Sequence, residues 1–173
     1  MDKFLLRRIS EGVFEPISKE FLLTMSALDF LEGDCITNIL KRSRINFHTN
    51  SNSNVQEMIL AMSFDTIITP HSHTNKDESF HILKGKLGIA ILDEHKPIIN
   101  NLLMLQAING PYFYRIRKGV RHLIVPISEI CIVHETTQGP FVKGEANVPQ
   151  WASHSDGTDK VLAMRTEIQS ALS

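Results

Sequence analysis

Residues 70–85 read PHSHTNKDESFHILKG, and the interpretation of the chain starts from them. Side chains two positions apart on a strand point to the same face, so His71 and His73 project together where the chain is extended. After a polar connection, Glu78 opens a run in which alternate positions are apolar. Gly85, between two lysines, is typical of a tight hairpin, because glycine adopts positive φ without steric cost. The pattern predicts adjacent strands that carry two imidazoles and one carboxylate.

A third imidazole, His122, follows Gly119 by three residues and starts another apolar run. Two imidazoles and a carboxylate on adjacent strands can converge on one divalent metal ion. A His-x-His pair alone arises often by chance, and a lone histidine is more often a surface or core residue. The added spacing of Glu78 and Gly85 favours a metal site that leaves positions for water or substrate. The expected ligands of one divalent ion per chain (Zn, Fe, Mn, Ni or Co) are His71, His73, Glu78 and His122.

The sequence around this stretch alternates with a period of two. Runs rich in Ile, Leu, Val and Phe occur at residues 56–63, 66–73, 78–83, 86–93, 98–106, 112–117, 120–127 and 130–136. Short strands at this spacing, with no helical pattern between them, are typical of an antiparallel sandwich or barrel. We therefore expect an all-β fold.

Both ends of the chain are expected to be helical. Ser18 is suited to the N-cap of a helix over 18–43, in which apolar residues recur at helical spacing, and a polar loop follows as far as Asn54. Residues 158–172 predict a short C-terminal helix on the outside of the barrel. The expected organisation is an N-terminal helical extension and loop (1–54), a barrel (55–145) and a C-terminal tail and helix (146–173).

The composition is that of a globular protein. The chain has 173 residues, of which 42% are apolar, and its net charge is −1, so no strong field attracts nucleic acid or an anionic membrane. The apolar runs are too short to span a bilayer, and the N-terminal one is too short for a signal peptide. Cys35 and Cys131 lie far apart without a CxxC pattern, so we expect reduced thiols and a cytoplasmic location.

These residues resemble a known superfamily. The spacing His71-x-His73-x4-Glu78-x6-Gly85 is similar to the first cupin motif, and Gly119-x-x-His122 resembles the core of the second. The resemblance implies a double-stranded β-helix (jelly-roll) barrel in which the four ligands named above hold the metal. The chain departs from the motifs at three turn positions, which are occupied by Asp65, Arg117 and Pro126.

A narrower resemblance covers residues 18 to 155. Arg44-Ile45-Asn46-Phe47-His48, followed by Val55-Gln56, is similar to the WbuC family of cupin metalloproteins. Glu135-Thr136-Thr137-Gln138-Gly139-Pro140-Phe141 and Pro149-Gln150-Trp151-Ala152 are similar to the same family. Members of that family tend to be encoded among genes for O-antigen and other surface polysaccharides, so the resemblance implies a pathway without a reaction.

Two further residues are candidates for proton transfer. Glu135 alternates with Cys131 and Val133, which places its carboxylate among apolar neighbours. Three roles are open for this carboxylate: a general base, a hydrogen-bond partner of a metal-ligating histidine, or an ion pair with Arg115 or Arg117. His48 lies in a polar loop before a strand, where it is either a substrate contact at the barrel mouth or an ordinary surface histidine.

An aromatic and basic cluster is the candidate for substrate binding. It consists of Tyr112, Tyr114, Arg115 and Arg117. Arginine binds phosphate in a bidentate manner, and a nucleotide sugar carries phosphates. An edge strand with alternating solvated residues has the same pattern, so both interpretations stay open.

The function expected first is a metal-dependent isomerase or epimerase that acts on a sugar or sugar nucleotide, since a metal polarises a carbonyl and a nearby Glu135 or His48 moves the proton. A non-haem iron dioxygenase is the second class, because its ligand types are the same. A non-catalytic protein that binds a glycan or small molecule through the metal is the third. We expect a homodimer, which would cover strand edges, and neither a nucleic-acid nor a membrane partner.

Overall fold

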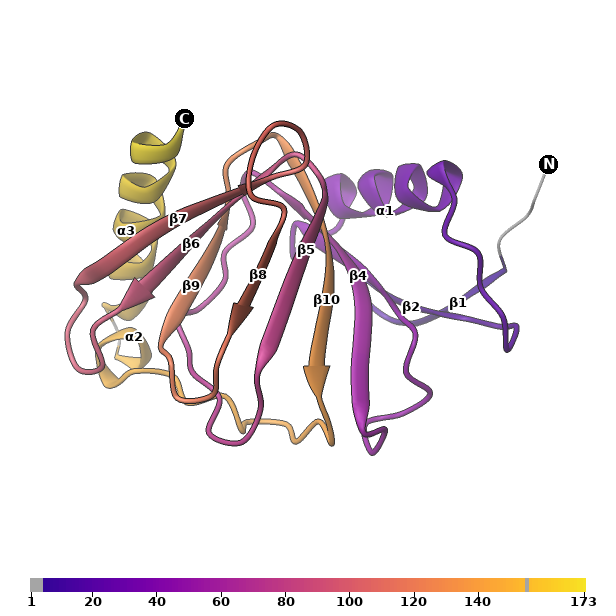
Figure 1. Ribbon diagram of the computed structural model, residues 1–173, viewed down its shortest axis with the longest axis horizontal. Helices are drawn as coiled ribbons and strands as arrows, with labels where there is room; N and C mark the ends of the chain where they lie inside the picture. Colours follow the sequence, from indigo (N-terminus) through magenta and orange to yellow (C-terminus); the bar gives the residue numbers. More distant parts are fainter. Residues whose placement is uncertain (1–4, 155) are drawn as a thin grey trace.

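The computed structural model describes residues 5–154 and 156–173, and in them the chain is mostly β structure arranged in two sheets (Figure 1). The large sheet has the strand order β1-β2-β3-β4-β10-β5-β8. Its strands, in that order, are β1 (Leu6–Ser10), β2 (Val13–Pro16), β3 (Arg42–Asn46), β4 (Val55–Ser63), β10 (Ile130–Gln138), β5 (Glu78–Lys84) and β8 (Phe113–Ile116). The small sheet consists of β7 (Ile99–Gln106), β6 (Lys86–Leu92) and β9 (His122–Pro126), in that order. Three helices accompany the sheets in these described residues: α1 (Met25–Thr37), α2 (Gln150–Ser153) and α3 (Gly157–Leu172).

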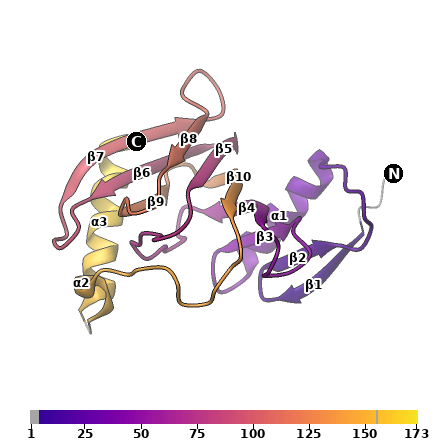
Figure 2. The same ribbon diagram turned by 60° about the horizontal axis from the view of Figure 1, so that its bottom comes forward.

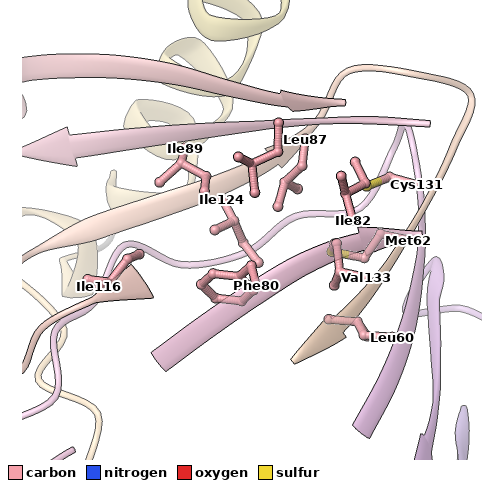
Figure 3. Packing of buried hydrophobic residues seen from close by; sticks show 11 residues of the cluster. Leu60, Met62, Phe80, Ile82, Leu87, Ile89, Ile116, Ile124, Cys131 and Val133 are labelled. Atoms are coloured by element: carbon pink, nitrogen blue, oxygen red, sulfur yellow. The ribbon is translucent and has the colours of Figure 1, made fainter. Parts of the chain in front are cut away.

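The two sheets pack face to face through an apolar layer. Alternation along the strands sends one set of side chains from each sheet into the space between them. Figure 3 shows Leu87, Ile89 and Ile124 of the small sheet facing Phe80 and Ile82 of the large one. We call these facing surfaces the inner faces. The buried members of the layer are Leu60, Met62, Phe80, Ile82, Leu87, Ile89, Leu105, Ile116, Ile124, Cys131 and Val133.

The helices cover the outer faces of the sheets. Leu31 and Cys35 of α1 pack on Ile45, Ile59 and Ile132 of the large sheet. On the small sheet, α3 packs through its own buried residues, Val161, Met164 and Ile168. Figure 2 shows α1 and α3 at opposite ends of the molecule. None of the helices within residues 5–154 and 156–173 has the length and apolar character that crossing a membrane requires.

The strand predictions are confirmed for seven of the eight runs, each of which overlaps one strand between β4 and β10. The prediction of a strand over 66–73 is wrong. Pro70 lacks a backbone N–H for pairing, and this segment forms a loop with isolated bridges from His71 to His122 and from Ser72 to Asn147. The predicted C-terminal helix is confirmed as α3. In the described residues, the sheets are not joined into the closed barrel that the cupin resemblance implies.

The N-terminal part differs most from the prediction. The helix begins at Met25 instead of Ser18, because the side chain of Thr24 accepts a hydrogen bond from the N–H of Ala27 at 3.4 Å. The helix ends at Thr37, and residues 42–46 form β3, where the prediction had the helix end and a loop. A β1–β2 hairpin, also missed, extends the same sheet. The domain boundaries stay a prediction, and the predicted absence of a signal peptide rests partly on residues 1–4, outside the described residues.

Gly85 provides a test of the turn between β5 and β6. Its φ is +77°, and a Cβ at this position would lie 2.2 Å from the carbonyl oxygen of Ile130. We expect Gly85→Ala to lower the free energy of unfolding by roughly 2–5 kcal/mol, measured by urea denaturation. Gly33→Ala is the control, because a Cβ there meets no atom within 4 Å, and it should stabilise α1 by about 0.5–1 kcal/mol. Equal effects of the two substitutions would contradict the described turn.

Candidate metal centre

The site is built where the loop before β5 meets β9. The backbone N–H of His71 donates to the carbonyl oxygen of His122 at 3.0 Å, and the reverse bond measures 2.9 Å. The N–H of Gly119 donates to the carbonyl oxygen of His73 at 2.7 Å, in a turn where Gly119 has a φ of +82°. These bonds fix the loop histidines against a strand of the small sheet. Glu78, the first residue of β5, belongs to the large sheet, so both sheets contribute to the site.

Three of the four expected ligands converge. His71, Glu78 and His122 each offer one ligand atom, and these atoms lie within 4.8 Å of one another. Glu78 and His122 are buried, and the rings of His71 and His122 have their centroids 4.6 Å apart. The alternation predicted for β9 is confirmed, since Ile124 is in the inner apolar layer and His122 shares its face. The structure thus contains a His/Glu/His group that can bind a metal ion.

The two closest imidazoles are held by their own backbone. Nδ1 of His71 lies 2.9 Å from the carbonyl oxygen of Thr69, and Nδ1 of His122 lies 3.0 Å from that of Val120. Because a carbonyl oxygen only accepts, Nδ1 carries the proton in each ring, and the Nε2 lone pair remains available for a metal. Burial, together with the neighbouring His122, lowers the pKa of His71 to about 4, so this ring is neutral at pH 7.

The carboxylate of Glu78 lies between two imidazoles. Its Oε1 is 3.0 Å from Nε2 of His73, and its Oε2 is 3.1 Å from Nε2 of His122. Burial by itself would raise the pKa of Glu78, but the imidazoles of His122 and His73 hold this pKa well below its usual range. Glu78 is therefore ionised throughout the physiological pH range.

The residues fit a bound cation. Among the described residues, neither Oε2 of Glu78 nor Nε2 of His122 has a hydrogen-bond partner, although both atoms are buried and lie 3.1 Å apart. A neutral His122 with its proton on Nδ1 cannot donate a hydrogen bond from Nε2 to Oε2, so the buried pair is satisfied only when the ring is a cation or when a bound cation lies between the two atoms. A divalent ion that accepts both lone pairs satisfies both atoms.

His73 lies beside this group. Its ring centroid is 4.9 Å from that of His71 and 6.3 Å from that of His122, and its Nδ1 is buried without a hydrogen-bond partner in the described part of the chain. Contact with Glu78 places His73 next to the site, and its role as the fourth ligand stays a prediction.

Glu135 lies on the inner face of the large sheet, as its alternation with Cys131 and Val133 predicted. It is the register partner of Phe80, and Glu78 is two residues from Phe80 on the same face, so the two carboxylates are diagonal neighbours. Burial raises the pKa of Glu135 to about 7, and the charge of Glu78 adds to the rise. In the described residues Glu135 makes no ion pair, and Arg115 pairs with Asp77 at 2.7 Å instead.

His48 follows β3, which is three strands from β5 in the large sheet. Nδ1 of His48 lies 3.1 Å from the carbonyl oxygen and 3.2 Å from the amide nitrogen of Glu57. Burial lowers the pKa of His48, so its ring is neutral at pH 7. These contacts fix the ring to the backbone of β4, and a catalytic role for His48 stays a prediction.

The predicted substrate-binding cluster does not share one face. Tyr114 packs against the inner apolar layer, as does its neighbour Ile116. Arg115 alternates with Tyr114 and is exposed, and Tyr112 is exposed with its ring 5.7 Å from that of His81. Arg117 is exposed beyond the end of β8. Only Tyr114 therefore lies on the metal-bearing face, and a common binding role for the four stays a prediction.

The sequence interpretation missed three polar residues on the inner face. Arg42, Arg44 and Asn46 alternate along β3 with Ser43 and Ile45, and Ile45 packs under α1. The alternation of polar with buried positions was the available signal. It was hidden because residues 42 and 43 were assigned to the end of a helix and the rest to a loop.

Comparison with known proteins gives three results. The family described as a domain of unknown function (DUF6016) matches residues 23–104. No curated protein sequence matches the chain. Solved structures similar to it include a cupin-2 domain containing protein from Shewanella frigidimarina, at 23% identity and a TM-score of 0.42 over 56% of this chain and 79% of that chain.

Two further similar structures differ more in sequence. KdgF from Halomonas sp. is 12% identical, with a TM-score of 0.45 over 57% of this chain and 80% of that chain. L-ribose isomerase from Cellulomonas parahominis is 12% identical, with a TM-score of 0.47 over 64% of this chain and 65% of that chain. Cupin-domain proteins are thus among the structures that this chain is similar to.

The metal content of the purified protein tests the site. We expect one divalent ion per chain by elemental analysis, and we expect His122→Ala to lose most of it, because the remaining donors cannot close the site. His95→Ala is the control, since the side chain of His95 is 83% exposed and lies outside the group. Unchanged metal content in both His71→Ala and His122→Ala would contradict the assignment.

The raised pKa of Glu135 predicts a pH-dependent stability. Between the usual pKa of 4.5 and the folded value of about 7, the folded state binds more protons than the unfolded state, so the free energy of unfolding falls as pH rises. Glu135→Gln removes this penalty. We expect the variant to be more stable than wild type by about 1–3 kcal/mol at about pH 8 and by little at about pH 4.5.

The measurement is urea unfolding at both pH values, with the metal removed by a chelator. Glu129→Gln is the matched control, because Glu129 is exposed near the start of the same strand. A stability difference that does not change with pH would show that the Glu135 carboxyl has an ordinary pKa.

Proposed function

We propose that the chain is a WbuC-like cupin metalloprotein that isomerises or epimerises a sugar or sugar nucleotide in surface polysaccharide biosynthesis. The observation that carries this proposal is the His/Glu/His group, in which Oε2 of Glu78 and Nε2 of His122 are buried without hydrogen-bond partners in the described residues, next to a second carboxyl with a pKa of about 7. The sequence resemblance around Arg44–His48 and Glu135–Phe141 supports the pathway. We place the reaction in the cytoplasm.

His71, Glu78 and His122 would hold the ion, with His73 as the fourth donor. A divalent ion supplies Lewis-acid polarisation of a carbonyl or hydroxyl oxygen. Glu78 is ionised, and the Nδ1 atoms of His71 and His122 are occupied by carbonyl oxygens, so Nε2 is the atom that each ring would offer to the ion.

Glu135 is the residue that we assign to proton transfer. A carboxyl with a pKa near 7 has both protonation states populated at neutral pH, so it can accept a proton from a carbon next to a carbonyl and return it. Glu135 is half-buried, and its neighbours on the inner face, Phe80 and Val133, are buried and apolar, which favours the neutral carboxyl. His48 is a second candidate for a substrate contact, at the end of β3.

A homodimer is part of the proposal. β1 and β8 end the large sheet, and an edge strand presents backbone groups that a second copy can pair with or cover. Size-exclusion chromatography with light scattering measures this directly, and a monomer at all concentrations would contradict it.

Solvent exchange tests the reaction class. The metal-loaded protein is incubated in D2O with a panel of aldoses, ketoses and nucleotide sugars, and NMR records deuterium at the carbon next to the carbonyl. We expect incorporation with at least one member of the panel, and we expect Glu135→Gln to reduce the rate by about 100-fold or more with metal content unchanged. Glu129→Gln should react at the wild-type rate.

The same samples distinguish the alternatives. Oxygen consumption that requires iron, without deuterium incorporation, would show a dioxygenase and overturn the proposal. Binding of a sugar without exchange or turnover would show a non-catalytic binding protein. Full activity of Glu135→Gln would remove Glu135 from the reaction and leave the metal site intact.

A further inference from the structure

Two arginines lie on the same inner face as the candidate metal site. In the register of β3 with β4, Arg42 pairs with Met62 and Arg44 pairs with Leu60. Directly paired residues point to the same side of a sheet, and Met62 and Leu60 belong to the apolar layer between the sheets. The side chains of Arg42 and Arg44 therefore project toward the inner face, away from α1.

Neither guanidinium has a partner within residues 5–154 and 156–173. No hydrogen bond or ion pair involves either side chain, and Nε of Arg44 is buried without a hydrogen-bond partner. Both residues are half-buried. Burial lowers the pKa of Arg42, and the charge of Arg44 lowers it further. Glu135 is the opposite charge that acts on both arginines, since it raises the pKa of Arg42 and the charge of Arg44 lowers that of Glu135. No side chain of the described residues hydrogen-bonds to either guanidinium, so both present N–H donors to an anion on this face.

The sheet register connects the arginines to the metal site. The next inward-facing row consists of Asn46 on β3, Met58 on β4, Glu135 on β10 and Phe80 on β5. Glu135 thus lies between the β3 arginines on one side and Glu78 on the other, on a single face. Asn46 adds a buried Oδ1 without a hydrogen-bond partner in the described residues.

We propose that Arg42 and Arg44 bind an oxyanion of the substrate, a phosphate or a carboxylate, while the sugar lies over Glu135 toward His71, Glu78 and His122. This inference rests on the proposed function and names its substrate class: an anionic sugar derivative. A planar guanidinium matches both anions through paired N–H donors, and the unpartnered Oδ1 of Asn46 accepts a hydrogen bond from a hydroxyl group.

Calorimetric titration of the metal-loaded protein tests the anion site. The probes are inorganic phosphate, D-glucuronate and, as the neutral comparison, D-glucose. We expect at least one anion to bind more tightly than D-glucose. Tighter binding of phosphate would identify a phosphate as the oxyanion of the substrate, and tighter binding of D-glucuronate would identify a carboxylate. Arg44→Gln should raise the Kd of that anion by about 10- to 100-fold, with metal content unchanged.

Two further variants control the result. Arg8→Gln removes an exposed arginine from β1 of the same sheet and should leave the Kd unchanged. Arg44→Lys keeps the charge without the planar fork, so it should give a smaller loss than Arg44→Gln and is informative even where the glutamine variant folds poorly.

Three outcomes would overturn the anion site. In the first, the wild-type protein binds none of the anions. In the second, the Kd of the anion is the same in Arg44→Gln and Arg44→Lys as in the wild type. In the third, Arg44→Gln dissociates a dimer and leaves the Kd of the anion unchanged. The last would show that a carboxylate of a second copy pairs with the arginines. Absence of deuterium exchange with normal anion binding would overturn the proposed reaction alone, so the two failures are distinguishable.

Discussion

The apolar layer between the two sheets is the constraint on which the site depends. Each strand has two faces, and once Phe80, Ile82 and Ile124 are buried in that layer, the residues that share their faces must point the same way. Glu78 and His122 are those residues at one end of β5 and β9. The hydrophobic packing that stabilises the fold therefore also directs a carboxylate and an imidazole toward each other. Glu78 and His122 lie on the same inner faces as the apolar layer, directly beside it.

The strands that could be predicted are short runs rich in Ile, Leu, Val and Phe that have turn residues beside them. Seven runs between residues 55 and 138 have this pattern and form strands. The N-terminal part failed for two reasons. Apolar residues at helical spacing continue before Thr24 and after Thr37, and nothing in that periodicity shows that Thr24 is the cap. The β3 segment is short and mostly polar, so its alternation is a weak signal beside the helical spacing that precedes it, and its pairing with β2 and β4 identifies it as a strand.

The candidate site was predictable only in part. The spacing of Glu78 and the position of His122 on a strand were sufficient, because both depend on local alternation. His71 and His73 were expected on a strand, but they lie in a loop that is held by backbone hydrogen bonds to His122 and Gly119. Such long-range pairing is absent from local periodicity. The β3 arginines were missed for the same reason, since their proximity to Glu135 depends on the order of strands in the sheet.

The hydrogen bonds from Nδ1 of His71 and His122 to carbonyl groups two residues earlier have a further consequence. Each ring is oriented by its own segment of chain. The site is thus preorganised, and capture of a metal requires little loss of side-chain entropy. The orientation of both rings is then part of folding, and a divalent ion bound by them would need to order neither side chain further.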